Sequence, residues 1–479
     1  MMHSALEEKT HSKSMLEKAI SVGRRVRSFQ TEILASVVAA LGLFIGFFYR
    51  LSWRFEESFL YFGIISSLFL LLLIASVFVC LRYDHVRQKE KEQIDHHEDS
   101  LRSEWVFGVM AVVLLMDFYI FSDWLAPVPW TILAILVLGG GCTVGLKKSW
   151  DSAWRFLGLV GALYFTTIVV VEPINIEKAD MLPLVRMGIE SFLDGATPYA
   201  QRSESIGTFI LEFHYLPGLW LSYLPTVALD LDMRLYNLLA LGGLVGLLFL
   251  GFHRTYDHRV LGLTLLPVIF SPVVVPLVAH GHIWPFWLAT AAFGVVFLKG
   301  RLIGAAILLG LLLATRQMAL FIAAPVAVYL LLRIKFSESL RFGTIAVVIF
   351  LGIIGPFWAF SPDFLTETYL GFESKGLAHI KEMGNPLNQI SFAGLLYHLG
   401  LYEISRPIQI MILLAFFGFI IRDRSMDTGR FLRLCGVVYL LLIGFNPFVY
   451  PYHYVSGLLL LAIGFADPKP LVKAQGFSV

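Results

Sequence analysis

Residues 299–317 read K-G-R-L-I-G-A-A-I-L-L-G-L-L-L-A-T-R-Q, and they contain the pattern that decides the fold. An uncharged apolar run, residues 302–313, lies between the basic link K-G-R and the polar end T-R-Q. Such runs are typical of helices that cross a bilayer, for which ~20 residues are needed. We therefore expect a membrane-spanning helix with a basic inner end and a polar outer end.

Apolar runs of this kind recur along the whole chain. Hydrophobic residues make up 57% of the sequence and charged residues 15%, with a mean hydropathy of +0.74, values that indicate an integral membrane protein. We predict an all-α polytopic membrane protein with about 14 transmembrane helices. The other expected spans are residues 33–48, 60–81, 107–120, 131–146, 156–171, 235–252, 260–275, 286–298, 320–332, 342–357, 408–421, 437–445 and 455–465.

The positive charges sort to one side of the membrane. With a cytoplasmic N-terminus, 27 of the 37 Lys and Arg residues fall on the cytoplasmic side. This sorting requires that residues 215–229 do not cross the bilayer completely; Pro217 and Pro225 favour a re-entrant segment, and a full span is the alternative. The net charge of +2 gives no indication of a nucleic-acid partner.

The chain divides into three predicted parts. Residues 1–31 form a cytoplasmic N-terminal segment, residues 32–150 an accessory four-span bundle and residues 151–479 the catalytic membrane module. We expect both termini in the cytoplasm and the active site outside. The absence of an N-x-S/T sequon fits a bacterial or archaeal cell membrane better than the endoplasmic reticulum. The expected outer segments gather His, Tyr, Trp and charged residues: 172–232, 279–284, 315–318, 359–406 and 446–454.

The first outer segment contains A-D-M-L-P-L-V-R-M-G-I-E-S-F-L-D-G-A-T-P-Y, residues 179–199. Its apolar residues recur at helical spacing, which predicts an amphipathic helix in the membrane interface that ends at Gly195. Asp180, at the start of this helix, would lie at headgroup depth and accept a proton from an acceptor hydroxyl. An N-cap is the structural alternative for this carboxylate.

Several further polar residues of the outer segments are binding candidates. Arg316 lies at the outer end of a span, where snorkelling to the interface is the alternative to a binding role. Lys375 and Arg186 are other cations on this side. His214, His282 and His453 lie on the expected outer side as binding candidates, and we regard a zinc site made by them as disfavoured because they come from separate loops without short ligand spacing. Ring faces of Tyr199, Tyr452 and Tyr454 suit sugar packing or an aromatic belt.

The order of these motifs resembles the GT-C superfamily of polyprenyl-phosphate-sugar-dependent glycosyltransferases. Asp180, the helix, G-A-T-P-Y (195–199) and F-H-Y-L-P (213–217) look like the first outer loop of its mannosyltransferase-type branch, which includes the bacterial phosphatidylinositol-mannoside enzymes. The similarity covers residue 156 to the end. Further landmarks are D-x-R-x-Y-N (232–237), G-H-x-W (281–284), T-R-Q (315–317) and N-P-x-x-Y-P-Y-H-Y (446–454).

The chain departs from the family pattern at three places. The second landmark often reads G-Q where this chain has Gly281 and His282, and the third often has Lys in place of Arg316. In one branch the first carboxylate belongs to a D-x-D motif, whereas here the nearest acid to Asp180 is Glu177. We therefore expect no cofactor and do not favour a divalent metal.

The resemblance implies an inverting glycosyltransferase that moves a hexose, with mannose as the first candidate, from a polyprenyl-phosphate donor to a lipid or glycan acceptor. Asp180 would be the general base, and the phosphate leaving group needs no general acid. The implied substrate-binding residues are Arg316, Gln317, Tyr199, His214, Tyr215, His282, Lys375, Tyr452 and His453. A multi-pass transporter or flippase of lipid-linked glycans is the alternative, although the spans lack central charges and the chain has no recognisable repeat.

Overall fold

The computed structural model describes residues 161–163, 165–171, 173–174, 181–200, 202–206, 209–252, 274–361, 363, 391–446 and 449–464. The predicted segments 1–31 and 32–150 lie outside these residues. Asp180 and Lys375 lie outside them too.

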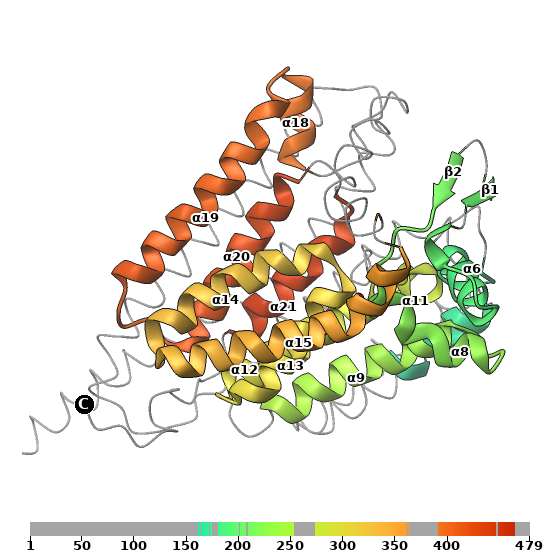
Figure 1. Ribbon diagram of the computed structural model, residues 1–479, viewed down its shortest axis with the longest axis horizontal. Helices are drawn as coiled ribbons and strands as arrows, with labels where there is room; N and C mark the ends of the chain where they lie inside the picture. Colours follow the sequence, from blue (N-terminus) through green and yellow to red (C-terminus); the bar gives the residue numbers. More distant parts are fainter. Residues whose placement is uncertain are drawn as a thin grey trace, which may run out of the picture.

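The described residues form a helical bundle, as the periodic apolar runs predict (Figure 1). The long helices coincide with predicted spans, and each ends near a charged, polar or glycine residue. They are α9 (Arg234–Phe252), α12 (Trp284–Leu298), α13 (Leu302–Thr315), α14 (Leu320–Arg333), α15 (Phe336–Phe360), α19 (Ser405–Arg422), α20 (Thr428–Gly444) and α21 (Val455–Ile463).

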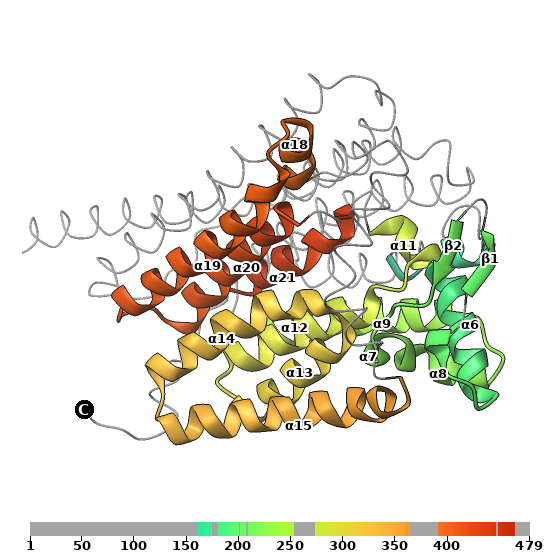
Figure 2. The same cartoon turned by 45° about the horizontal axis from the view of Figure 1, so that its top comes forward.

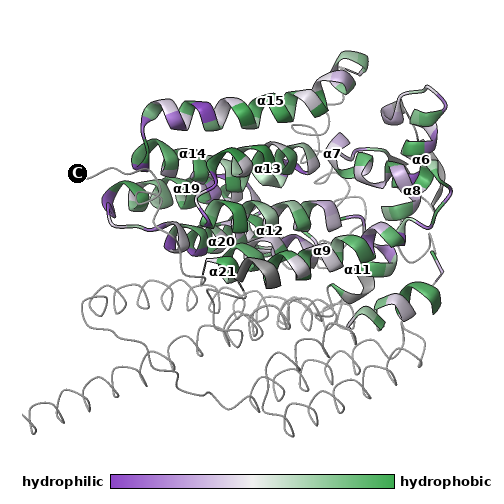
Figure 3. Cartoon of the chain, turned by 90° about the horizontal axis from the view of Figure 1, so that it is seen from below, coloured by the Kyte–Doolittle hydropathy of each residue, from purple (hydrophilic) through white to green (hydrophobic). Residues whose placement is uncertain are grey.

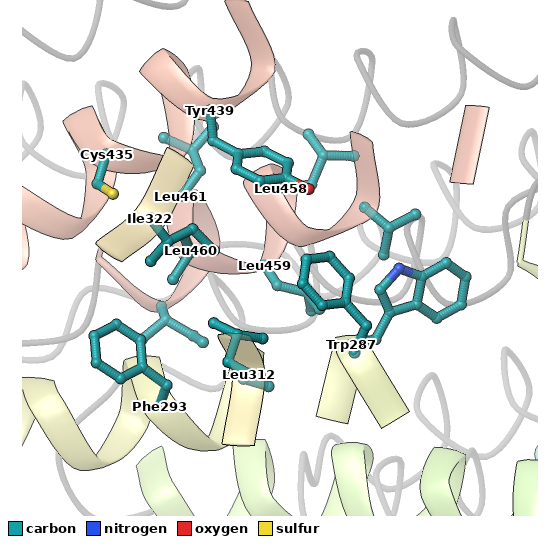
Figure 4. Packing of buried hydrophobic residues seen from close by; sticks show 14 of the residues in the cluster. Trp287, Phe293, Leu312, Ile322, Cys435, Tyr439, Leu458, Leu459, Leu460 and Leu461 are labelled. Carbon is teal, nitrogen blue, oxygen red and sulfur yellow. The ribbon is translucent and has the colours of Figure 1, made fainter. Parts of the chain in front are cut away.

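The core lies where α12, α13, α14, α20 and α21 meet (Figure 4). Trp287 and Phe293 of α12, Leu312 of α13 and Leu459 of α21 are all fully buried there. Helix α12 is apolar on nearly every side, which is typical of a helix surrounded by other helices. The main stabilising interaction is therefore apolar packing between helices.

Helices α20 and α21 approach each other closely at two glycines. A Cβ atom added to Gly436 would lie 2.6 Å from the carbonyl oxygen of Gly457, and one added to Gly457 would lie 2.7 Å from the Leu440 side chain. Small residues at a helix contact allow this close approach, as they do in membrane proteins. The contact brings the residues that precede α21 against the body of the bundle.

Two helical stretches of the described residues are long and apolar enough to cross a membrane, Phe336–Phe360 and Tyr402–Arg422. Most of their apolar side chains face outward; Phe360 is 83% exposed and Leu414 61% exposed. Hydrophobic residues predominate along most of the described helices (Figure 3). A helix of 25 residues is about 37 Å long, more than the hydrocarbon thickness of a bilayer. These properties are consistent with a membrane protein.

Short elements gather at one end of the bundle (Figures 1 and 2). They include a two-stranded antiparallel hairpin, in which Arg202 pairs with Glu212, and the all-helical prediction did not include it. The elements are α6 (Met181–Leu193), η1 (Pro198–Ala200), β1 (Arg202–Ile206), β2 (Phe209–Glu212), α7 (Pro217–Trp220), η2 (Leu221–Tyr223), α8 (Leu224–Ala228) and α11 (Val275–His280).

Residues 215–229 form three short helical pieces, α7, η2 and α8, in place of one continuous helix. The piece η2 is a 3-10 turn; Pro217 is the first residue of α7, and Pro225 is the second residue of α8. None of the three pieces is long enough by itself to cross a bilayer. The non-helical residues 213–216 that precede them lead directly into the candidate site.

Candidate functional site

Helix α6 starts at Met181, directly after the predicted base, and ends close to Gly195, which has a φ of +80°. The apolar face was expected to lie in the membrane interface. Instead Leu182, Val185 and Ile189 are buried in one cluster with Trp220. That face is covered by protein, so the amphipathic pattern reflects packing on α7, η2 and α8. Met181 packs against the main core, so the N-terminal end of α6 lies at the bundle.

The two motifs of the first outer segment are tied together by hydrogen bonds. The hydroxyl of Tyr199 donates to the carbonyl oxygen of Tyr215 at 3.1 Å, and Trp220 Nε1 donates to the same hydroxyl at 3.2 Å. Thr197 Oγ1 lies 3.0 Å from Ser361 Oγ at the end of α15. Tyr199 therefore holds F-H-Y-L-P in place, and its hydroxyl is already occupied by protein groups.

A glycine allows α7 to dock on the end of α13. A Cβ atom at Gly218 would lie 2.7 Å from the carbonyl oxygen of Ala314. Leu216, Ala314 and Ile354 form a small buried cluster at this junction. Ala314 precedes Arg316 by only two residues. The docking of α7 therefore brings the segment that carries Tyr215 to the segment that carries Arg316.

Arg316 is the centre of the site, and two imidazoles hold its guanidinium. Its Nη1 lies 2.8 Å from His453 Nε2, and its Nη2 lies 2.7 Å from His282 Nε2. The guanidinium carbon is 5.8 Å from the centroid of the Tyr452 ring, which is a cation–π distance. No carboxylate forms an ion pair with Arg316 among the residues that the structure describes. The charge is held in position without being neutralised.

Hydrogen-bond chemistry determines the protonation of His282. A guanidinium only donates, so His282 Nε2 must accept from Arg316 and the ring proton must be on Nδ1. His282 is buried, and its Nδ1 has no hydrogen-bond partner within the described part of the chain. Burial first, and then the charge of Arg316, hold the pKa of His282 well below its ordinary value. His282 is therefore a neutral imidazole with an unused N–H donor.

His453 faces two donors at once. Its Nδ1 accepts from the backbone N–H of Tyr450 at 3.2 Å, while its Nε2 lies 2.8 Å from Arg316 Nη1. A neutral imidazole has only one acceptor nitrogen, so these two N–H groups compete for it. The preceding residues add a stacked pair of rings, Tyr450 and Tyr452, with centroids 5.3 Å apart.

Aromatic rings continue the site toward the first outer segment. The ring of Tyr215 lies 4.2 Å from that of His282 and 4.5 Å from that of His214, centroid to centroid. His214 and Tyr215 therefore belong to the same group of residues as Arg316. Four separate chain segments contribute to this group, which we call the Arg316 site: residues 214–215, His282, Arg316 and residues 450–453.

Other predicted residues are placed less centrally. Gln317 begins η3 (Gln317–Ala319), next to Arg316, and its side chain has no hydrogen bond to another described residue. Arg186 was expected among the phosphate-binding cations. Instead it pairs with Glu190 at 2.7 Å and with Asp230 at 3.5 Å on an exposed surface. Its charge is balanced by carboxylates, so we remove it from the candidates. No group of metal-ligating side chains occurs in the described ranges.

The structure also identifies a residue to which sequence reasoning assigned no role. Asn237 of α9 is fully buried and bonds to Tyr223 and to backbone carbonyls near His282. Asp232, in the same motif, is partly buried, which raises the pKa of its carboxyl, but the hydrogen bonds from Arg234 together with the charges of Arg234 and Arg186 lower it on balance. An Asn inside an apolar span was the available signal, because a buried amide requires partners.

Comparison with known proteins adds no further assignment: no protein-family model, no curated protein and no solved structure matches this chain. The similarity of its motifs to the GT-C superfamily stays a prediction. The function must be argued from the residues of the Arg316 site and from the sequence pattern around them.

Proposed function

We propose that the protein is an inverting, polyprenyl-phosphate-sugar-dependent glycosyltransferase of the GT-C type. It would move a hexose, with mannose as the first candidate, to a lipid or glycan acceptor at the outer face of a membrane. The observation that carries this proposal is the Arg316 site. Four motifs that are far apart in the sequence, and that the family resemblance names separately, meet there around one cation.

The chemistry of Arg316 suits a lipid phosphate. When the sugar leaves its carrier, negative charge develops on the departing phosphate, and a guanidinium stabilises that charge through charge-assisted hydrogen bonds. A carboxylate partner would reduce this capacity. Arg316 is held by neutral imidazoles instead, so its full positive charge is available to an anion.

The unused donor of His282 fits the same ligand. Its Nδ1–H is buried, and leaving such a group unpaired costs about 1–3 kcal/mol. A phosphate oxygen or a sugar hydroxyl would satisfy it. The ring of Tyr452 lies beside the cation and that of Tyr215 lies beside His282, and aromatic rings at such positions suit the packing of a sugar or of the first carrier isoprenes.

Asp180 is the proposed general base. It directly precedes Met181, whose side chain packs against the core of the bundle. One carboxylate is sufficient, because a sugar phosphate has a good leaving group and only the acceptor hydroxyl must lose a proton. Attack from the face opposite the phosphate inverts the anomeric centre.

The proposal includes a membrane topology. The protein would be a multi-pass membrane protein with both termini in the cytoplasm, and the Arg316 site would face outward. The broken segment 215–229 supports a re-entrant arrangement. In an Asp257→Cys variant, the introduced thiol should react with an impermeant reagent only from the cytoplasmic side; labelling from outside would contradict the topology.

The experiment that tests the activity compares Asp180→Asn with Asp194→Asn in membranes. The assay supplies a radiolabelled polyprenyl-phosphate sugar and a lipid extract. Loss of the base should lower transfer by about 10²–10⁴-fold, whereas Asp194, exposed beyond the other end of α6, should be dispensable. Transfer at the parental rate by Asp180→Asn would remove the base assignment. Movement of the lipid-linked sugar across the membrane without any transfer would favour the flippase alternative.

A further inference from the structure

The carboxamide of Asn237 is fully engaged. Its Oδ1 accepts from the hydroxyl of Tyr223 at 2.6 Å, and its Nδ2 donates to the carbonyl oxygens of Val278 and Gly281, both at 2.9 Å. A longer contact of 3.4 Å joins Nδ2 to Leu277. The two short bonds use both amide hydrogens, so the orientation of the amide is determined by its partners.

These bonds control the end of helix α11. The last carbonyls of a helix lack their usual partners four residues on; here residues 277–280 are buried, and the Leu277 carbonyl accepts from the Gly281 N–H at 2.9 Å. Trp284 Nε1 donates to the carbonyl oxygen of Leu277 at 2.8 Å, and Asn237 Nδ2 donates to the carbonyl oxygens of Val278 and Gly281. The carbonyl of Gly281 belongs to the peptide bond that joins it to His282. Asn237 therefore holds the peptide plane from which the His282 side chain extends.

Gly281 makes this restraint necessary. A Cβ atom at this position would lie 2.7 Å from the Leu277 side chain and 2.9 Å from the Leu277 carbonyl oxygen, so glycine is required. Glycine also leaves the backbone free to rotate. Rotation of the peptide plane between Gly281 and His282, about the backbone dihedrals on either side of it, would move the imidazole away from Arg316. The hydrogen bond from Asn237 removes that freedom.

We propose that Asn237 is a positioning residue of the Arg316 site. Through Gly281 it holds His282 Nε2 at hydrogen-bonding distance from Arg316, and it thereby sets the direction in which the guanidinium meets an anionic group. The coupling between Asn237, His282 and Arg316 follows from the contacts alone. Its consequence for a lipid phosphate rests on the proposed function.

Two variants separate positioning from general packing. Asn237→Ala removes the amide that donates to Val278 of α11 and to Gly281. Trp284→Phe removes a hydrogen bond at the same end of α11, to Leu277, without affecting the bond to Gly281. Both changes are made at fully buried positions, so both should lower stability. Of the two, only Asn237→Ala should change the position and the tautomer of the His282 ring. Tyr223→Phe removes the hydroxyl that donates to Asn237 Oδ1. It should shift the tautomer of His282 in the same direction as Asn237→Ala, but to a smaller extent.

The test that does not depend on activity is nitrogen NMR of the full-length protein with labelled histidine. The His282 signal is assigned by its loss in His282→Gln. The parent and Trp284→Phe should show a neutral ring protonated on Nδ1, and Asn237→Ala should show a mixture of tautomers. An unchanged tautomer in Asn237→Ala overturns the proposal. If that variant does not fold, Tyr223→Phe decides: a His282 signal identical to the parental one overturns the proposal equally.

The second measurement is binding of a polyprenyl monophosphate to the protein in lipid nanodiscs. Asn237→Ala should weaken binding about 10-fold, and it should have no further effect when His282 is already Ala, because the two residues act through one contact. Equal losses in both backgrounds would overturn the proposal. If the parent protein binds no polyprenyl monophosphate, the proposed function fails, while the NMR result still decides the role of Asn237.

Discussion

An arginine lies at each end of the helical stretch formed by η3 and α14, and the two arginines are held in different ways. Arg316 precedes the helix, and Arg333 is its last residue. Each lies near a tyrosine ring, at 5.8 Å for Arg316 with Tyr452 and at 5.9 Å for Arg333 with Tyr329. Each has a buried Nε without a partner among the described residues. The difference lies in the acceptors of the terminal nitrogens.

At the Arg333 end the acceptors are backbone carbonyls. Arg333 donates to the carbonyl oxygens of Arg424, at 2.5 Å, of Ile420, at 3.2 Å, and of Asp423. The carbonyl of Ile420 lies in the last turn of α19, and those of Asp423 and Arg424 lie just beyond the end of the helix. Close by, Arg430 forms an ion pair with Asp423. This end has the features of a structural cap, in which cations satisfy the end of a helix.

At the Arg316 end the acceptors are imidazole nitrogens, which can exchange partners. A backbone carbonyl is an acceptor at every pH, and its position does not depend on a side-chain rotamer. An imidazole loses its acceptor when the ring is protonated, and the acceptor moves away when the ring turns. Similar cations at the two ends of one helical stretch can therefore serve stability or ligand binding, depending on the groups that accept their hydrogen bonds.

The sharpest test of this contrast exchanges each arginine for alanine. Arg316→Ala should lower glycosyl transfer by about 10²–10³-fold, the loss typical of a group that stabilises a developing anion. Arg333→Ala should leave the transfer rate of the folded protein near parental and lower its stability by about 1–3 kcal/mol, because carbonyls at the end of α19 lose their donor. Transfer rates and thermal unfolding of both purified variants check the prediction. Equal effects on transfer would end the distinction.

The next test disturbs how the Arg316 end is assembled. In Gly218→Ala the new methyl group would overlap the carbonyl of Ala314, which is backbone and cannot move easily. We expect a loss of about 1–3 kcal/mol in the free energy of unfolding, with weaker binding of a polyprenyl phosphate. Gly242→Ala is the matched control, since a Cβ atom there meets nothing within 4 Å and alanine favours the helix α9. Denaturant unfolding measures the stability of both variants. Equal stability of Gly218→Ala and Gly242→Ala would contradict the close approach of α7 to α13.

Acid should act on the Arg316 end through His282. The pKa of His282 lies well below 6.5 in the folded protein, so below that pH the unfolded chain binds a proton that the folded chain does not. The contribution of this residue to stability is present above about pH 6.5 and is lost as the pH falls. The groups around it that are charged or titrate are Arg316, His214 and His453. The melting temperature of the parent should fall more steeply with acid than that of His282→Gln; parallel curves would show that His282 is not responsible.

The smallest expected effect comes from the ring beside Arg316. Tyr452→Leu should weaken binding of a polyprenyl phosphate by about 2–5-fold, because it removes a cation–π contact of about 0.5–1 kcal/mol. Tyr452→Phe keeps the ring face and should bind with near-parental affinity. A larger loss in the Phe variant than in the Leu variant would assign the role to the hydroxyl. Titration of a polyprenyl phosphate into nanodiscs that contain each variant measures the two affinities.

The positions of the long helices along the chain could largely be predicted from the sequence, because each long helix carries a nearly continuous apolar run. Arg316, His282 and His453 could be identified as polar residues at the ends of such runs, but not as partners of one another. Their contact depends on how α7 docks and on the close approach of α20 and α21, which are tertiary properties. The role of Asn237 could not be predicted for the same reason: its partners lie about 40 residues away.

Other expectations failed because a local pattern has more than one physical cause. The amphipathic face of α6 predicts lipid contact or protein contact equally well, and the structure shows protein contact. Arg186 has the right charge on the predicted side, but neighbouring carboxylates compensate it. The hairpin of β1 and β2 has short, partly polar strands in a long connection, which gave no strong alternating pattern.

The position of His453 between two donors has a consequence for the ligand-free protein. One acceptor nitrogen cannot serve both Tyr450 and Arg316, so one contact of the resting site is always compromised. An anion that draws Arg316 away resolves this conflict and leaves His453 to Tyr450. The ligand-free state is therefore locally frustrated, because one of its hydrogen bonds is compromised. Moving Arg316 toward a ligand then costs less free energy than it would if both hydrogen bonds were fully formed.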